Sequence, residues 1–180
     1  MDDKQIEVIY NQTFPGLTFY YRDTTLSQDL ISKYTIGQIL IEHGFMDLSY
    51  KGGGLATNFR YLIASAHAKK IGAITPEGDK FGHALLPSNS YFKLLDIYKI
   101  GDKTQVFLLE IPASAVDFFA KFNSNIEEDV IKKARESFDN RIHLSPVAEL
   151  QSEEWKQRTE SPVGMNEKGE FSYDLGSGID

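Results

Sequence analysis

The alternation of apolar and polar positions predicts a sheet built around one hairpin. Aromatic and β-branched residues fill the segment 17–22, which follows the turn at Pro15-Gly16 and therefore predicts a strand. Two strand-like segments flank the turn at 101–103, and the second of them, 105–111, is nearly all apolar. Such a run is typical of a central strand that is covered on both faces. We expect a mainly antiparallel sheet with a central hairpin at about 91–111.

Other segments carry the signals of helices. A hydroxyl residue followed three positions later by Gln, Asp or Glu is the capping-box pattern, and it opens several apolar runs of helical spacing. The first ten residues show only a weak alternation through Ile6, Val8 and Tyr10. The expected helices run from about 35 to 43, from Thr57 or Asn58 to Gly72, and onward from Ser114 and from Ser124. Together with the hairpin they indicate an α+β fold in which helices cover the sheet.

The length of 180 residues suits one domain, and the chain contains no internal repeat or linker between two domains. We expect a single α+β domain over residues 1–150. After Ser145 one short helix is predicted at 152–156, and beyond it five proline and glycine residues interrupt any period. Residues 151–180 are therefore expected to be a loosely ordered extension.

Composition narrows the class of protein. Hydrophobic residues make up 41% and charged residues 25% of the chain, as in ordinary globular proteins. No apolar run approaches the ~18 residues of a membrane span, and Met1-Asp2-Asp3-Lys4 does not open a signal peptide. The chain has no cysteine, which suits a reducing compartment. We expect a cytoplasmic protein without contact with a membrane.

The net charge of −7 belongs almost wholly to the second half of the chain. Residues 1–90 hold 9 acidic and 8 basic residues, whereas residues 91–180 hold 17 acidic and 11 basic residues. Nucleic acid is a poor partner for such a surface, because phosphate binding usually needs concentrated basic residues. A basic protein partner is easier to accommodate. The alternative interpretation is that the acidic surface simply aids solubility.

A glycine-rich loop is the first candidate site. The residues Lys51, Gly52, Gly53, Gly54 and Thr57 lie just before the helix expected from position 57 or 58. Exposed N–H groups at the start of a helix attract anions, and glycines let a phosphate approach closely. The loop is not a P-loop, because its lysine precedes the glycines. The alternative is a flexible connector.

The second candidate site combines Arg22, at the end of the aromatic strand, with Asp47 and Ser49. A guanidinium presents paired donors that suit a phosphate or a carboxylate. The ordinary alternative is that Arg22 pairs with Asp23 or Asp47.

Residues 17–111 resemble the ADP-ribosyltransferase toxin fold in their order of a strand with Arg, a helix, Gly-Phe with a nearby Ser, a further helix and an apolar strand. The resemblance implies that Arg22 binds NAD and that the segment Asp47-Leu48-Ser49, in place of Ser-Thr-Ser, lines the pocket. The family's catalytic Glu lies in a late Glu/Gln-x-Glu motif. This chain offers only Glu149-Leu150-Gln151, in reversed order, and Glu153-Glu154 in an expected helix. The chain therefore departs from the family where its catalysis is centred.

The remaining reactive residues form no recognisable constellation. The four histidines, His43, His67, His83 and His143, are not spaced as metal ligands, and no cysteine can assist them. We therefore expect no metal site, and no pattern indicates a cofactor. The Gly-x-Ser-x-Gly motif of a nucleophilic serine is absent as well.

Two hypotheses of function follow. The first is a small cytoplasmic binding protein without catalysis, of the toxin-neutralising type, whose acidic surface engages a protein partner. The alternative is an enzyme that acts on a nucleotide or another phosphorylated ligand and is distantly similar to ADP-ribosyltransferases. If Arg22, Asp47 and Ser49 lie far apart in the fold, this alternative loses its basis.

Overall fold

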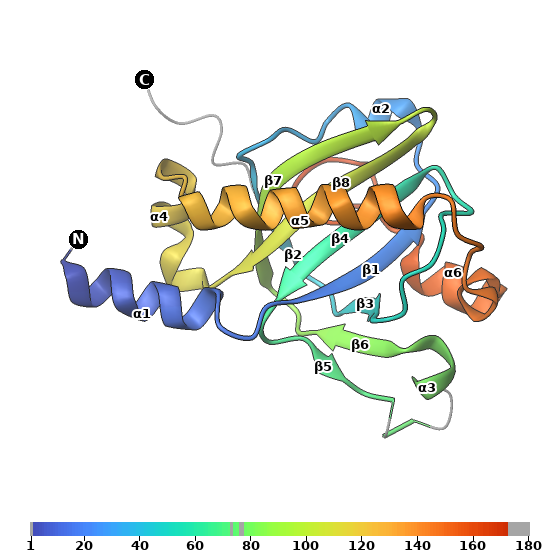
Figure 1. The fold of residues 1–180 in the computed structure, drawn as a ribbon, viewed down its shortest axis with the longest axis horizontal. Coiled ribbons are helices and arrows are strands. Elements are labelled where there is room, and N and C mark those ends of the chain that lie inside the picture. Colours follow the sequence, from blue (N-terminus) through green and yellow to red (C-terminus); the bar gives the residue numbers. More distant parts are fainter. Residues whose placement is uncertain (1, 73, 76–77, 173–180) are drawn as a thin grey trace.

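The computed structural model describes residues 2–72, 74–75 and 78–172. Its centre is an eight-stranded sheet with the spatial order β2-β7-β8-β4-β1-β3-β6-β5, in which β4 and β8 are parallel and the other pairs are antiparallel. The strands are β1 (Thr18–Thr24), β2 (Ile39–Glu42), β3 (Met46–Ser49), β4 (Phe59–Ser65), β5 (Lys69–Lys70), β6 (His83–Leu86), β7 (Ser90–Ile100) and β8 (Lys103–Ile111). The prediction of an α+β fold is confirmed (Figure 1).

The central hairpin is formed as predicted by β7 and β8. Gly101 makes its turn with φ of +59°, a conformation that favours glycine over other residues. β8 lies between β7 and β4, and the run Val106–Leu109 is buried throughout. An almost continuous apolar strand is stable there because both of its faces are covered.

Helices cover the sheet and flank it. They are α1 (Asp3–Thr13), α2 (Gln28–Ile31), α3 (Gly78–Phe81), α4 (Val116–Lys121), α5 (Asn125–Arg141) and α6 (Glu153–Thr159), with short 3₁₀ segments η1 (Ala113–Ala115) and η2 (Ala148–Gln151). α5 begins at the predicted capping box, where the Ser124 side chain accepts from the Glu127 N–H and the Glu127 carboxylate accepts from the Ser124 N–H. No helix among the described residues is long and apolar enough to cross a membrane.

Two predicted helices were wrong. Residues 35–38 form a turn, in which the Thr35 N–H donates to the Gln38 side chain, and the chain continues into strand β2. The segment from Thr57 to Gly72 contains strands β4 and β5. Every residue of β4 is buried, and it pairs with β1 on one side and β8 on the other. When nearly every position of a segment is apolar, the spacing of a helix is always matched and cannot distinguish a helix from a strand. The aromatic and β-branched residues of this segment were the better indication, and they favour a strand.

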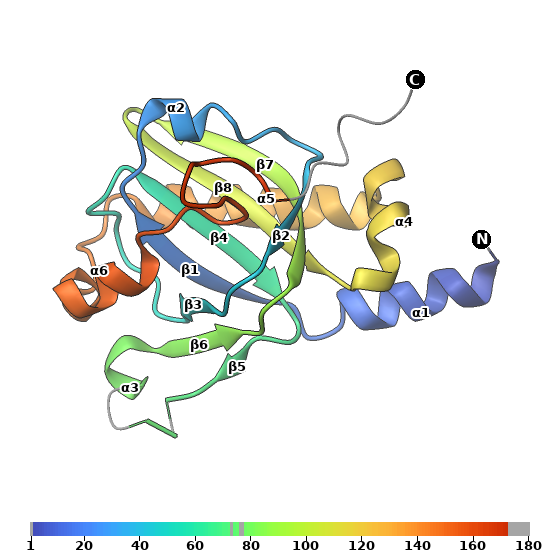
Figure 2. The same cartoon turned by 180° about the vertical axis from the view of Figure 1, so that it is seen from behind.

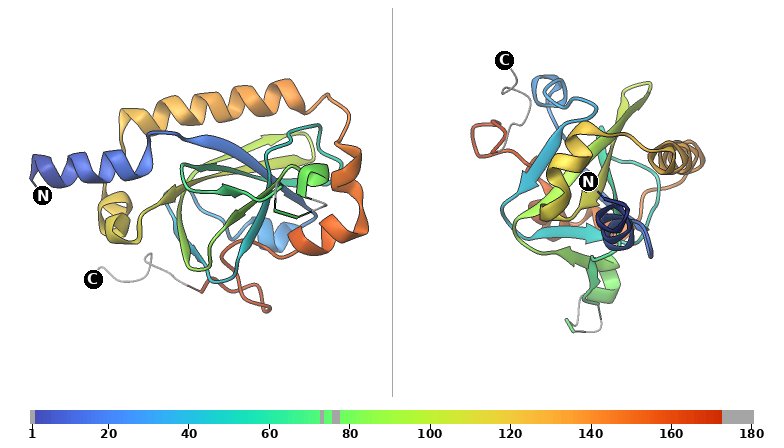
Figure 3. Two further views of the ribbon diagram at one scale, coloured as in Figure 1. Left: turned by 90° about the horizontal axis from the view of Figure 1, so that it is seen from below. Right: turned by 90° about the vertical axis from the view of Figure 1, so that its left-hand side faces the viewer.

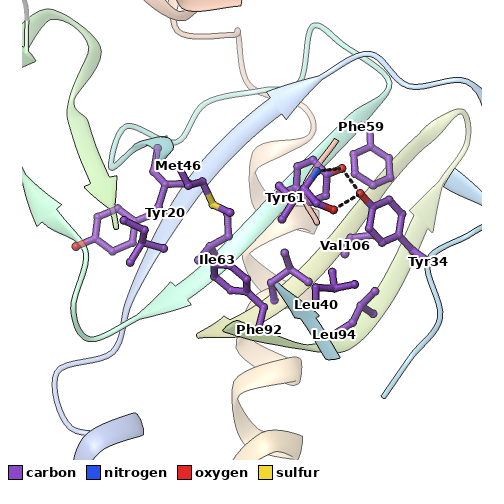
Figure 4. Close-up of a cluster of buried hydrophobic side chains, with 14 of the residues drawn as sticks. Tyr20, Tyr34, Leu40, Met46, Phe59, Tyr61, Ile63, Phe92, Leu94 and Val106 are labelled. Carbon is purple, nitrogen blue, oxygen red and sulfur yellow. Dashed lines mark hydrogen bonds between the residues drawn. The ribbon is translucent and has the colours of Figure 1, made fainter. Parts of the chain in front are cut away.

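The two faces of the sheet carry separate hydrophobic clusters. Helix α5 lies across one face of the sheet, as the view from below shows (Figure 3, left). There Leu62, Phe107 and Leu109 are buried together with Ala134 of the helix. The opposite face holds a cluster that includes Tyr20, Leu40 and Tyr61 (Figure 4). Val163, far along the chain, belongs to the same cluster.

The segment after α6 returns to the sheet. Residues 160–172 lie as a loop on the face opposite α5 (Figure 2), and we call them the C-terminal strap. Within it, Met165 and Phe171 form an isolated β-bridge, and the Asn166 side-chain oxygen accepts two backbone N–H groups. The division at residue 150 stays a prediction, and residues 173–180 of the expected extension lie outside the described residues.

Candidate active site

Arg22 of β1 points into the protein and is 4% exposed. Its Nη1 donates to the carbonyls of Asp47 and Arg158 at 3.1 and 3.2 Å, and its Nη2 donates to the carbonyl and Oγ of Ser161 at 3.1 and 3.0 Å. Its Nε is buried without a hydrogen-bond partner. Burial lowers the pKa of Arg22, while the negative charges of Glu42 and Asp47 act in the opposite direction. Four neutral acceptors thus surround a buried cation.

Asp47 of β3 bonds to a residue of the neighbouring strand. Its Oδ1 lies 2.6 Å from Nε2 of His83, at the start of β6. In the register of the two strands His83 stands opposite Ser49, so Asp47 is its diagonal neighbour. The imidazole is 8% exposed and the carboxylate 20%. His83 Nδ1 forms no hydrogen bond within the part of the chain that the structure describes.

Two side chains of helix α6, Trp155 and Arg158, contact the pair of Asp47 and His83. Trp155 stacks on Phe81 with ring centroids 5.0 Å apart and meets His83 edge-on at 5.3 Å. Arg158 lies with Nη1 3.8 Å from Asp47 Oδ1 and Nη2 3.5 Å from Glu154 Oε1. Ser152 begins the helix, because its side chain accepts from the Trp155 N–H.

A cleft of about 280 Å³ opens beside the pair, lined by Ile71, Thr75, Gly78, Phe81, His83, Glu154 and Arg158. An imidazole (His83), a carboxylate (Glu154) and a guanidinium (Arg158) therefore line the same cleft. Behind one wall of the cleft, Lys80 Nζ lies over the ring of the lining residue Phe81 at 4.9 Å, and Lys51 Nζ donates to the Lys80 carbonyl at 2.6 Å.

The other predicted ligand-binding residues do not line this cleft. Ser49 is fully buried, and its Oγ donates to the Phe81 carbonyl at 2.6 Å and accepts from the Lys51 N–H at 2.9 Å. Ser49 thus joins two segments and does not open to the cleft. Thr57 lies in a separate polar groove with Asp23 and Lys156.

The three glycines stand in a packed loop that precedes a strand. Gly52 and Gly53 accept hydrogen bonds through their carbonyls from Arg141 and Arg60 at 2.7 and 3.0 Å. The Gly54 N–H donates to the Ser145 carbonyl, and an added Cβ at Gly54 would lie 1.7 Å from a backbone oxygen. The helix expected from Thr57 is absent and strand β4 follows the loop, so no helix N-terminus is present there to bind an anion.

The sequence predicted Arg22 and Asp47 as site residues but did not predict their neighbours His83 and Arg158. His83 lies 36 residues after Asp47, and the Arg158 carbonyl that caps Arg22 lies 136 residues after it. Arg22 does not pair with Asp23, which binds Arg60 through two contacts of 2.7 and 2.8 Å. The described residues hold no group of three His, Asp or Glu side chains that could bind a metal ion.

The comparisons with known proteins bear on the fold. A scan against protein-family models finds no match, and a search of curated proteins finds no relative. Among solved structures, the chain is similar to the ADP-ribosyltransferase HopU1 of Pseudomonas syringae pv. tomato, with a TM-score of 0.47, 18% identity and coverage of 53% of this chain and 45% of that one. It is similar to the ADP-ribosyltransferase toxin Vis from Vibrio splendidus, with a TM-score of 0.44, 18% identity and coverage of 56% and 51%.

A third similar structure is the type III effector XopAI from Xanthomonas axonopodis pv. citri, with a TM-score of 0.46, 13% identity and coverage of 57% and 46%. The chain thus matches about half the length of these proteins. With TM-scores below 0.5, none of their residues is carried over to this chain.

These comparisons correct the first functional hypothesis. A binding protein without catalysis was the leading prediction, and it is wrong, because the structures found are named as ADP-ribosyltransferases and as an effector. The alternative, an enzyme acting on a nucleotide, fits them better.

Proposed function

We propose that this protein is an enzyme that acts on a nucleotide in the cleft beside His83, with NAD as its first candidate substrate. The observation that carries the proposal is the hydrogen bond between Asp47 and His83 at the wall of a cleft that Arg158 also lines. A histidine held by a carboxylate is a common general base, because the carboxylate fixes its tautomer and stabilises its protonated form.

Each residue of the cleft has a role in this proposal. The Asp47 carboxylate accepts a hydrogen bond from the Nε2–H of His83, so that the proton stays on Nε2 and Nδ1 carries the free electron pair. His83 Nδ1 takes the proton of a hydroxyl or water that attacks the substrate. Arg158, whose side chain is 45% exposed, is available to a phosphate at the mouth of the cleft.

With NAD, the attacking oxygen forms a bond to C1′ of the nicotinamide-bearing ribose. The bond from C1′ to the ring nitrogen breaks, and nicotinamide leaves as a neutral molecule with that electron pair. The proton of the nucleophile passes to His83. The other product is ADP-ribose, free when water attacks and attached to the acceptor when a hydroxyl group attacks.

The resemblance of residues 17–111 to the ADP-ribosyltransferase toxin fold supports NAD as the substrate. Arg22, which it implies as the NAD-binding residue, lies on β1 next to β3, and its guanidinium contacts the Asp47 carbonyl. The family's Glu/Gln-x-Glu motif has no counterpart, and Glu149 and Gln151 stand in η2. In this proposal His83 supplies the base, and Glu154 is the glutamate that lines the same cleft.

The test is a screen of binding followed by product analysis. NAD, ADP and inorganic phosphate are titrated against the purified full chain while its melting temperature is recorded, and bound nucleotides are incubated and separated by chromatography. We expect NAD to raise the melting temperature and to yield nicotinamide. NAD that neither stabilises the protein nor releases nicotinamide would count against the proposal.

Asp47→Asn is the informative variant, because it removes the charge and leaves the volume. Its matched control is Asp102→Asn, an aspartate that is 85% exposed and does not line the cleft. Loss of nicotinamide release in the first variant alone would tie the reaction to the pair.

A further inference from the structure

The C-terminal strap lies on Arg22 and on the tyrosines beside it. Ser161 gives Arg22 two of its four acceptors. Val163 is bound through its backbone, since its N–H donates to Tyr61 Oη at 3.1 Å and its carbonyl accepts from Tyr34 Oη at 2.8 Å. The two tyrosine hydroxyls are hydrogen-bonded to each other, with their oxygens 2.6 Å apart; a dashed line marks this bond in Figure 4.

Charged side chains hold the strap further along. The Gly164 N–H donates to Glu42 Oε2 at 3.0 Å, and Lys33 Nζ donates to the Gly169 carbonyl at 2.6 Å. The strap is thus bound largely through its backbone, much as a protein binds a peptide ligand. Val163 is the one hydrophobic side chain of the strap that is fully buried within the described residues.

The strap resembles a nucleotide in two features, since it presents oxygen atoms to Arg22, as a phosphate would, and an aromatic ring to Tyr34, as a base would. At one end Ser161 presents oxygen atoms to a buried guanidinium. At the other end the ring of Phe171 meets Tyr34 edge-on, with centroids 5.4 Å apart. A phosphate would satisfy Arg22 better than neutral oxygens do, because bonds between ionised groups are stronger. The Nε of Arg22, buried and without a partner, is a donor that the strap leaves unused.

We propose that the C-terminal strap is an autoinhibitory segment: it covers Arg22, which is bonded to the Asp47 and Arg158 carbonyls beside the cleft, and it must leave before a nucleotide in the cleft can also bind Arg22. This inference rests on the proposed function and adds its regulation. A segment with few buried apolar side chains opens locally at a low free energy, while the sheet beneath it stays folded. The strap is also self-contained, because Gly169 N–H donates to the Asn166 carbonyl and Ser172 N–H to the Gly164 carbonyl.

The experiment compares the full chain with a chain that ends at Glu160, which keeps α6. NAD binding is measured by titration calorimetry after circular dichroism and cooperative unfolding show that both chains are folded. If the strap is closed in nine of ten molecules, the shortened chain binds NAD about tenfold more tightly. A synthetic peptide of residues 160–172 should bind the shortened chain and compete with NAD.

A second variant keeps the whole chain. Gly169 has φ of +70°, and a side chain there would approach Leu30, so Gly169→Val loosens the strap. Gly16→Val is the matched control, because Gly16 has φ of +81° and no atom within 4 Å of an added Cβ. We expect tighter NAD binding in Gly169→Val and unchanged binding in Gly16→Val. This comparison remains decisive if the shortened chain does not fold.

Equal NAD affinity in the loosened and the intact proteins would overturn the inference, and so would a peptide that binds without competing with NAD. A failure of the proposed function, as opposed to a failure of this inference, gives a different result. In that case NAD binds more tightly when the strap is loosened, yet no nicotinamide is released.

Discussion

The Oγ of Ser161 lies 3.0 Å from Nη2 of Arg22, a residue 139 positions earlier in the chain. This contact joins the C-terminal strap to the buried end of the candidate site. The carbonyl of Arg158 caps the same guanidinium, while the side chain of Arg158 approaches Asp47. One short stretch of chain therefore both lines the cleft and covers Arg22.

Replacing Ser161 by Ala tests how much this contact stabilises the fold. The variant loses one acceptor of a charged donor and keeps the backbone carbonyl, so we expect the free energy of unfolding to fall by roughly 1–2 kcal/mol. Urea denaturation measures the change. Ser32→Ala is the control, since Ser32 is exposed and its hydroxyl bonds to the nearby Asp29 carbonyl. Equal effects of the two changes would show that the Arg22 contact contributes little.

Substitutions in the buried ion pair of Arg60 and Asp23 are expected to lower the stability of the fold strongly. The Arg60 side chain is 1% exposed and binds Asp23 through Nε and Nη2. Burial acts to lower the pKa of Arg60, but the charge of Asp23 prevails and raises it. Asp23→Asn leaves a buried cation without its partner and should cost about 3–5 kcal/mol of stability.

Urea unfolding of Asp23→Asn beside Asp102→Asn checks this prediction. Asp102 is 85% exposed and lies 4.0 Å from Lys103, so its loss should change stability by less than about 1 kcal/mol. A similarly small loss in Asp23→Asn would show that the Arg60 charge is satisfied in another way.

The tyrosine pair under the strap predicts a loss of stability at alkaline pH. Burial raises the pKa of Tyr61 to about 12, and it raises the pKa of Tyr34 as well. In the unfolded chain both ionise near pH 10, so their contribution is complete below pH 10 and is lost as the pH rises toward 12. Tyr61 alone accounts for roughly 2–3 kcal/mol over this range.

Urea midpoints at pH 9 and pH 11.5 measure the effect. Tyr61→Phe should lose stability at pH 9, because its hydroxyl bonds to Tyr34 and to the Val163 N–H, yet it should show a weaker dependence on pH than the parent protein. Tyr10→Phe, at an exposed tyrosine, is the control. An unchanged pH dependence in Tyr61→Phe would contradict the assignment.

Gly54 is predicted to tolerate no side chain. A Cβ there would lie 1.7 Å from the Leu144 carbonyl oxygen, and because that neighbour is backbone it cannot rotate away. Gly54→Ala should therefore destabilise the protein by at least about 2 kcal/mol. Gly44→Ala serves as the control, since the nearest atom to its Cβ is a Glu42 side-chain oxygen at 3.5 Å. Thermal unfolding of the two variants compares them, and equal melting temperatures would refute the close approach.

The sequence predicted the hairpin because its two strands are adjacent and joined by a turn with glycine. It did not predict β4, because that strand is continuously apolar and its pairing with β8 joins segments far apart in the chain. Helix α1 also escaped prediction. Its signal was the capping box between Asp2 and Gln5, which the weak alternation of Ile6, Val8 and Tyr10 obscured.

The candidate site was predicted only in part for a related reason. Arg22 stood out as a guanidinium at the end of an aromatic strand, and Asp47 was considered with it because it lies in the segment after Gly44. His83 and Arg158 reach them through strand pairing and through the return of α6, and neither is encoded in local spacing. Such residues become visible only when the topology is known.

The central claim is that His83 acts as the base in a reaction on a nucleotide. The most direct test is the rate of nicotinamide release from NAD, at high NAD concentration, by the full chain and its His83→Gln variant. His43→Gln is the control, because His43 is exposed and bonds to Asn89 away from the cleft. The account predicts a fall of about 10²-fold or more in His83→Gln and no change in His43→Gln. Equal rates in all three proteins would contradict it.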